Sequence, residues 1–167
     1  MALASAAYLE TEPGADPCVP LDRLEGASDG LICLTGGADG PMGRLVQAGK
    51  EGPAAALAER LARAFPDRLY VELQRHGTGD ALHTAAEAAS EPGLVEIAYA
   101  KGLPLVATNE VYFDRPEMFE AHDALLCIGE GAYVNESGRR MLTPEHWLKP
   151  AEEIGRASCR ERVFPVV

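Results

Sequence analysis

The sequence predicts an α/β protein with parallel strands covered by outer helices. Three short apolar segments each end in polar residues or glycines, and segments with helical periodicity separate them. This alternation is typical of a parallel sheet or barrel. The predicted strands are residues 30–35, 69–76 and 103–107. Ligands of such sheets bind outside the carboxyl ends of the strands, so we expect any site to lie where these segments end.

The third predicted strand is the most clearly defined. Residues 105–107 form an apolar run, which favours a strand buried on both faces. Gly102 just before it predicts the C-terminal end of a helix over residues 94–101. Residues 91–93, with the sequence Glu-Pro-Gly, interrupt the Ala-rich helical sequence further upstream, and we expect either a small insertion or a break in the helix there.

The second predicted strand carries polar side chains on one face. A helix over residues 53–65, amphipathic and with proline in its first turn, leads into it. Glu72, Gln74 and His76 then alternate along the strand, so their side chains point the same way. We interpret Glu72 as a hydrogen-bonding residue inside the fold.

A further helix is predicted downstream of the third strand. Residues 114–117 combine a capping aspartate, a proline in the first turn and a glutamate, which together favour a helix start. The helix is expected to run to about Ile128. Its predicted buried face consists of Phe119, Leu125 and Leu126.

Composition narrows the class of function. The chain has 15 basic and 26 acidic residues and a net charge of −11, which opposes direct contact with nucleic acid. No apolar run approaches the length of a membrane span, and no leader sequence is apparent, so we expect a cytoplasmic protein that does not contact membranes. The 4 cysteines show no Cys-x-x-Cys spacing and are interpreted as reduced, mostly buried thiols.

Four blocks, in this order along the chain, resemble the second, C-terminal half of the PHP domain of bacterial DNA polymerase III alpha subunits. They are residues 29–37, 69–77, 102–110 and 120–128. The resemblance covers residues 1–153 and implies a partial, distorted (β/α)7 PHP barrel. It also implies that the chain is a fragment of a replicative DNA-directed DNA polymerase, a nucleotidyltransferase, without the polymerase active site.

The last residues do not resemble this family. Residues 154–167 are similar to a reading frame through a common sequencing-adapter sequence. We therefore predict a partial PHP domain over residues 1–153 and a non-native tail over residues 154–167.

The resemblance implies a metal site in intact members. PHP domains hold Zn or Mn ions with His, Asp, Glu and Cys ligands and can activate metal-bound water against a phosphodiester. The family's His-x-His pair and the Asp-His after it would lie upstream of Met1. Of the remaining ligands, His76 matches a family histidine, and residues 110–112 stand where the family has Asp-x-His.

The change at residues 110–112 predicts a degenerate site. Glu110 still offers a carboxylate, but the phenol of Tyr112 is a poor substitute for an imidazole ligand. We therefore expect remnant metal positions at His76 and Glu110, no catalytic residue, and no cofactor in this chain. Mg would serve the parent polymerase only. His76 has a second interpretation, as a hydrogen-bonding histidine at the end of a strand.

The other histidines are assigned no chemistry. His122 and Asp123 are expected to form capping or interhelix hydrogen bonds. His83 and His146 are expected to face solvent.

Three hypotheses follow. The first is a PHP segment with a structural or subunit-contacting role, whose partners are the rest of the alpha subunit and other replicase subunits, with DNA contacted only through the parent protein. The second is an active metal-dependent phosphoesterase or 3′–5′ exonuclease. The third is a small α/β binding module unrelated to replication.

Overall fold

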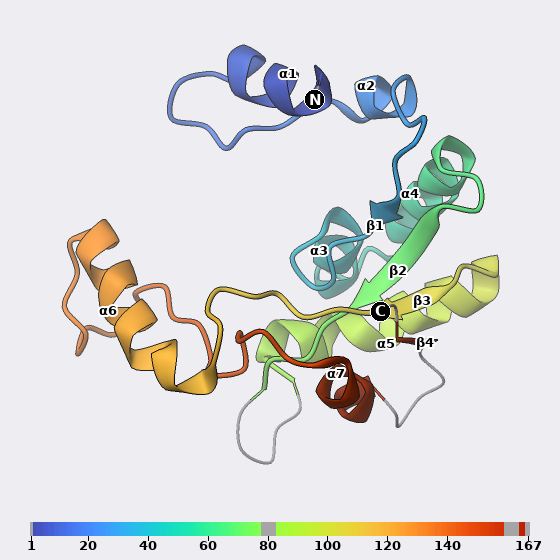
Figure 1. Ribbon diagram of the computed structural model, residues 1–167. Helices are drawn as coiled ribbons and strands as arrows, with labels where there is room; N and C mark the ends of the chain where they lie inside the picture. The colour runs from blue at the N-terminus through green and yellow to red at the C-terminus, as the bar shows by residue number, and fades with distance from the viewer. Residues whose placement is uncertain (1, 78–82, 159–163, 166–167) are drawn as a thin grey trace.

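The computed structural model describes residues 2–77, 83–158 and 164–165, and it contains a parallel sheet with the strand order β1-β2-β3-β4 (Figure 1). The strands are β1 (Cys33–Leu34), β2 (Leu69–Leu73), β3 (Leu105–Ala107) and β4 (Phe164–Pro165). The first three strands form inside the predicted segments, although each is shorter than predicted. The predicted α/β class, with parallel strands and outer helices, is confirmed.

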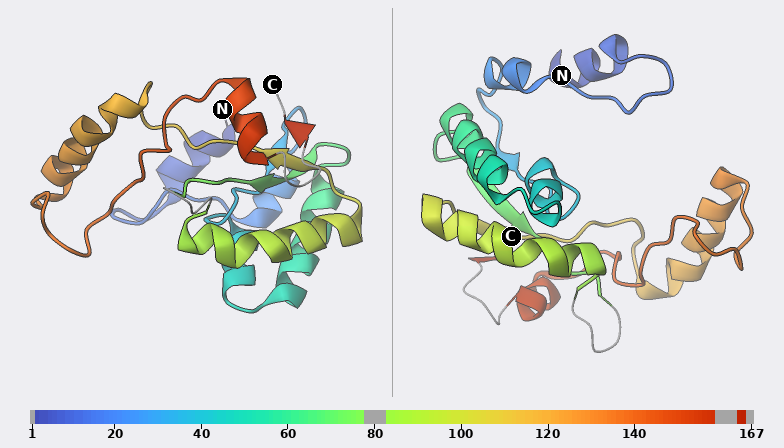
Figure 2. Two further views of the ribbon diagram at one scale, coloured as in Figure 1. Left: turned by 90° about the horizontal axis from the view of Figure 1, so that it is seen from below. Right: turned by 180° about the vertical axis from the view of Figure 1, so that it is seen from behind.

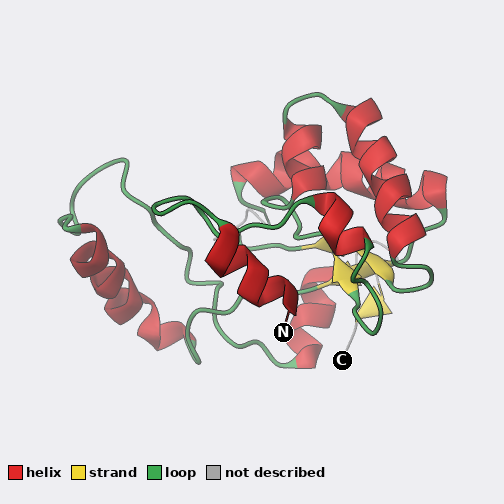
Figure 3. Cartoon of the chain, turned by 90° about the horizontal axis from the view of Figure 1, so that it is seen from above, coloured by secondary structure: helices red, strands yellow, loops and turns green. Residues whose placement is uncertain are grey.

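The described helices precede, separate and follow the strands along the chain. They are α1 (Ala2–Glu10), α2 (Leu21–Glu25), α3 (Pro41–Gln47), α4 (Glu51–Ala64), α5 (Ala85–Lys101), the 3-10 helix η1 (Pro116–Met118), α6 (Phe119–Glu130) and α7 (Ala151–Ser158). Figure 2 shows α3, α4 and α5 together on one side of the strands and α7 on the other. In Figure 3, α6 lies at the left, away from this central body, and Figure 1 shows α1 above the rest of the chain.

The core lies between the sheet and the group formed by α3, α4 and α5. Met42, Val71 and Leu94 are almost completely buried there. Helix α4 contributes small residues at helical spacing, since Ala54 and Ala58 are both fully buried. Small side chains at these positions let α4 approach its neighbours closely.

The predicted break at residues 91–93 is wrong. Helix α5 runs without interruption from Ala85 to Lys101 and contains Pro92. A strong N-terminus and tertiary packing outweigh the one lost backbone hydrogen bond. Gly93 has a packing reason to be here, because a Cβ atom added to it would lie 2.6 Å from Val46 Cγ1 on α3.

The predicted end of the same helix is confirmed. Gly102 caps α5 in the left-handed conformation, with φ of 63°, and its N–H donates to the carbonyl groups of Ala98 and Tyr99. Glycine adopts this conformation without steric cost, so the chain can turn directly into β3.

Helix α6 forms where predicted, but the prediction of its buried face is wrong. Asp123 and Cys127 are the buried residues of α6, whereas Leu125 is 61% exposed. Phe119 and Leu126 are only half-buried. The predicted aspartate cap is also wrong, because η1 and α6 start without a side-chain hydrogen bond. A helix that stands away from the core does not have to bury its apolar face.

The predicted domain boundary lies near the end of the chain. The predicted boundary after residue 153 falls inside α7, and β4 belongs to the segment predicted to be a tail. The boundary stays a prediction.

Among the described residues, no helix is both long enough and apolar enough to cross a membrane.

Candidate functional site at the strand ends

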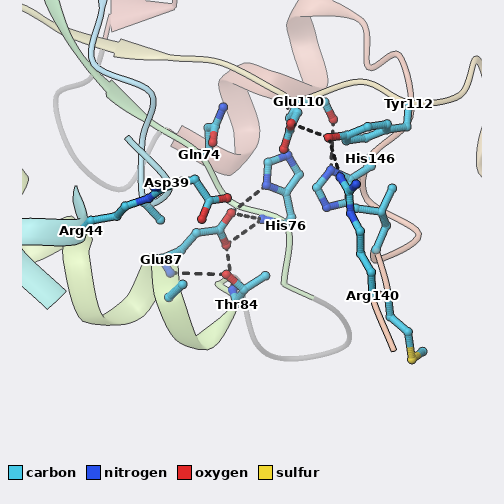
Figure 4. A pocket seen from close by; sticks show the side chains of 14 residues that line it. Asp39, Arg44, Gln74, His76, Thr84, Glu87, Glu110, Tyr112, Arg140 and His146 are labelled. Atoms are coloured by element: carbon cyan, nitrogen blue, oxygen red, sulfur yellow. Dashed lines mark hydrogen bonds and ion pairs between the residues drawn. The ribbon is translucent and has the colours of Figure 1, made fainter. Parts of the chain in front are cut away.

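A pocket of about 380 Å³ lies at the carboxyl ends of the strands, where the sequence predicts a site (Figure 4). Its wall comes from the connections after β1, β2 and β3, from the start of α5 and from residues 140–146. Polar lining residues include Asp39, Arg44, Gln74, His76, Thr84, Glu87, Glu110, Tyr112, Arg140 and His146. The topology of a parallel sheet brings these distant segments together.

His76 sits in the wall of this pocket and is only 2% exposed. Its Nδ1 atom lies 2.7 Å from Glu87 Oε1, and its Nε2 atom lies 3.2 Å from the backbone nitrogen of Glu110. The carboxylate can only accept and the backbone N–H can only donate. His76 therefore carries its proton on Nδ1, and both ring nitrogens are occupied by protein groups.

Glu87 holds His76 from the first turn of α5. Its carboxylate accepts the backbone N–H groups of His76, at 3.0 Å, and of Thr84, at 2.7 Å. The Thr84 hydroxyl accepts the N–H of Glu87 in return, which completes a capping box. Burial alone would raise the pKa of Glu87, but the hydrogen bonds from His76 and Thr84 lower it to about 2. Glu87 is thus a fixed negative charge.

His146 stacks on His76. The ring centroids are 4.0 Å apart and the planes differ by 5°. His146 Nδ1 lies 3.2 Å from the carbonyl oxygen of Glu110, so the Nδ1–H group donates a hydrogen bond to this oxygen. Burial first, and then the nearby His76, lower the pKa of His146, so its imidazole is neutral near pH 7. The prediction that His146 faces solvent is wrong, because it is 7% exposed.

Backbone pairing explains why His146 is buried. Residues 146–148 run parallel to residues 112–113, with an isolated bridge between Phe113 and Trp147. The Tyr112 N–H donates to the His146 carbonyl at 2.9 Å, and the Asn109 side chain donates to the Trp147 carbonyl at 2.7 Å. Because this pairing joins segments more than thirty residues apart, local sequence carries no sign of it.

Glu110 and Tyr112 interact with each other at the pocket's rim. The Tyr112 hydroxyl donates to Glu110 Oε1 at 2.7 Å, and Arg140 donates to the Tyr112 oxygen at 3.3 Å. The bond to Glu110 first, and then burial, raise the pKa of Tyr112. The Tyr112 ring meets His146 edge-on, with 5.7 Å between centroids, and remains 37% exposed.

Glu72 does what the sequence analysis expects. Its carboxylate accepts the Gly36 N–H at 2.8 Å and is also bonded to the Thr108 hydroxyl. The Thr35 hydroxyl accepts the backbone N–H of Glu72 at 2.9 Å. These bonds join the ends of β1, β2 and β3. The glycine-rich turn after β1 is thereby fixed by a carboxylate.

Charged pairs fix the surroundings of the pocket. Arg75 and Glu91 form a nearly buried ion pair, and His83 lies 2.9 Å from Glu91 with its side chain 26% exposed. His83 is therefore only partly solvent-facing, contrary to expectation. Asp123 pairs with Arg139 at 2.6 Å, which is a loop contact, whereas a capping or interhelix contact was predicted.

The residues present do not fit a PHP metal centre. The structure brings the two remnant positions together, but the Glu110 N–H occupies the lone pair of His76 Nε2, and the Glu110 carboxylate accepts from Tyr112. Within residues 2–77 and 83–158, no three His, Cys, Asp or Glu side chains are grouped so as to hold a metal. A metal would have to displace hydrogen bonds that the fold already makes. We therefore derive no catalytic step through a metal.

Two important residues of the site were not singled out from the sequence. Glu87 carries a local signal, since Thr84 and Glu87 have the spacing of a capping box. Its contact with His76, however, depends on how α5 packs at the end of β2. His146 has no local signal of any kind.

Comparison with known proteins identifies relatives of this chain. Residues 1–76 match the PHP domain family. The chain is 51% identical over 152 residues to DNA polymerase III subunit alpha of Caulobacter vibrioides, and 35% identical over 153 residues to that of Pseudomonas aeruginosa. It is also 35% identical over 157 residues to an error-prone DNA polymerase of Symbiobacterium thermophilum.

The coverage of these alignments is unequal. They include 91%, 90% and 92% of this chain, but only 13%, 12% and 14% of the relatives. The chain therefore spans about one-eighth of the length of the proteins that it matches. The resemblance found in the four sequence blocks is confirmed.

Proposed function

Because this chain carries a PHP domain segment similar to that of the DNA polymerase III alpha subunits, we propose that it is a structural part of such a subunit, a DNA-directed DNA polymerase of replication. In this role the segment holds a folded surface for the rest of the subunit and for other replicase subunits. Its negative charge assigns DNA contact to other parts of the parent protein. The location would be the cytoplasm, where chromosomal DNA is copied.

The observation that carries this proposal is the bonding of His76. Both of its ring nitrogens are used to join the ends of β2 and β3 to the start of α5. A buried histidine that is satisfied on both sides stabilises the fold, and losing one partner would leave a buried polar group unpaired. His76, which matches a family histidine, therefore acts in this chain as a hydrogen-bonding connector between these elements.

The neighbouring residues support the same role. Glu110 and Tyr112 bond to each other, so the carboxylate has a partner other than a metal. The His146 ring covers one face of the His76 ring and restricts access to it. We accordingly propose that residues 1–153 form the native PHP segment, with no metal-dependent hydrolysis of its own.

The test uses the full-length alpha subunit that contains this segment. We expect DNA polymerase activity with Mg²⁺ and no exonuclease that depends on Zn²⁺ or Mn²⁺. His76→Gln should lower the subunit's thermal stability, whereas the control His83→Gln, at a partly exposed position, should change it little. A Zn²⁺- or Mn²⁺-dependent 3′–5′ exonuclease that is lost in His76→Gln with stability unchanged would favour the active phosphoesterase instead.

A further inference from the structure

Helix α6 carries an apolar stripe on the side opposite to its buried residues. Ala121, Leu125 and Ile128 follow the i, i+4, i+7 spacing of a single helix face. Leu125 is 61% exposed and Ile128 is 78% exposed. The opposite face holds Asp123 and Cys127, which are the buried residues of this helix. Helix α6 therefore exposes an apolar stripe of the kind that a surface helix ordinarily buries.

The stripe is presented on a preformed unit. Two bonds of 2.6 and 2.7 Å join the Arg139 guanidinium to the Asp123 carboxylate, and Arg139 also donates to the Val134 carbonyl. The Arg139 side chain is only 4% exposed. The loop that follows α6 is thus fixed against its buried face. Figures 1 and 2 both show this helix and loop projecting away from the sheet.

The charges on α6 indicate what kind of surface would cover the stripe. Residues 119–130 contain no Lys or Arg, and Glu120 and Glu130 are exposed on the helix, with Glu117 exposed just before it. An apolar stripe with acidic neighbours is complementary to an apolar surface bordered by basic side chains. A second copy of this chain would bring the same acids together, and both copies would carry a net charge of −11.

We propose that the stripe of Ala121, Leu125 and Ile128 docks on an apolar surface bordered by Lys and Arg, elsewhere in the same alpha subunit. The proposal rests on the function proposed above. It is supported by the length of the relatives, about seven-eighths of which lies outside the aligned region. Exposed apolar stripes on a rigid helix are typical of interfaces rather than of free surfaces.

The experiment compares α6 in two settings by hydrogen exchange. In the full-length subunit the amides of α6 should exchange at least about tenfold more slowly than in the 167-residue chain, because docking suppresses local opening. The double variant Leu125→Asp with Ile128→Asp should abolish this protection in the subunit. In the 167-residue chain the same variant should leave the thermal midpoint unchanged. Leu125→Met with Ile128→Met, which keeps the stripe apolar, should retain the protection.

Several results would overturn the docking proposal. One is equally fast exchange of α6 in the subunit and in the chain. Another is protection that appears in the chain alone and grows with its concentration, which would identify a second copy as the occupant. A third is protection that requires an added protein. Polymerase activity, measured on the same preparation, tests the proposed function separately, so the two can fail independently.

Discussion

The imidazole rings of His76 and His146 stack with 4.0 Å between centroids, although 70 positions separate them in the chain. Each ring also bonds to the backbone of Glu110. The Glu110 N–H donates to His76, and the Glu110 carbonyl oxygen accepts from His146. The backbone of Glu110, which follows β3, is thereby held from both sides. The candidate site is a hydrogen-bonded connector that joins the ends of β2 and β3 to the start of α5.

Replacing Glu87 with glutamine should destabilise the chain in a pH-dependent way. The folded-state pKa of Glu87 is about 2, below its ordinary value of 4.5, so its stabilisation is present above pH 4.5 and is lost as the pH falls toward 2. We expect Glu87→Gln to lower the free energy of unfolding by on the order of 2 to 3 kcal/mol at pH 7. The loss should be much smaller near pH 3, because the wild-type carboxylate stabilises the fold less at that pH. Urea unfolding at both pH values measures this.

The matched control is Glu59→Gln. Glu59 pairs with Lys101 on the surface, and its side chain is 50% exposed. Exposed ion pairs contribute little, so Glu59→Gln should lower the stability far less than Glu87→Gln does. An equal loss at positions 59 and 87 would contradict the role given to Glu87.

Protonation of His146 should act in the same direction. The pKa of His146 is lowered in the folded chain, so the unfolded chain takes up this proton first as the pH falls through the ordinary value of 6.5. Stability should therefore decrease from pH 7 to pH 5, and His146→Phe, which keeps a ring, should reduce that decrease. Thermal midpoints across this range measure it. An identical pH dependence in the variant would refute the assignment.

A pair of glycine substitutions tests the packing of α5. Gly93→Ala would place a methyl group 2.6 Å from Val46 Cγ1, and we expect a cost of about 1 to 3 kcal/mol. Gly52→Ala in α4 meets nothing within 4 Å and should stabilise the chain by about 0.5 to 1 kcal/mol. Chemical denaturation of both variants gives the comparison. A neutral Gly93→Ala would mean that α3 and α5 pack less closely than described.

Tyr112 should contribute less than a fully buried ring. Because it is 37% exposed, Tyr112→Ala should cost about 1 kcal/mol, and Tyr112→Phe, which loses only the bond to Glu110, should cost less than that. Spectrophotometric titration should show ionisation of Tyr112 above its usual pH range, since its pKa is raised. A large cost for Tyr112→Phe would show that the bond to Glu110 matters more than the ring.

Local patterns predicted the elements of the fold better than their packing. The apolar run of residues 105–107 and the cap at Gly102 both predicted what is found, because each depends on a few neighbouring residues. Helix α5 and Pro92 show the limit of such patterns. The penalty of a proline inside a helix is local, but the contacts that outweigh it lie on α3 and at the end of β2.

The candidate site was predictable in place but not in detail. Parallel topology placed His76 and Glu110 at the same end of the sheet, as expected. Which hydrogen bonds they make depends on Glu87 and on residues 146–148, and the latter pair with the chain more than thirty residues upstream. For α6, the sequence predicted a buried face of Phe119, Leu125 and Leu126, but Leu125 is 61% exposed, because burial depends on what the helix packs against.

The most direct test of the connector role is a metal titration followed at His76. Two-dimensional NMR of the ¹⁵N-labelled chain should show His76 protonated on Nδ1, and its ring signals should be unchanged by Zn²⁺ or Mn²⁺ at micromolar concentration. Calorimetry in parallel should show no tight binding. Submicromolar affinity for either metal, with loss of the Nε2 hydrogen bond from Glu110 and disappearance of binding in His76→Gln, would contradict the account.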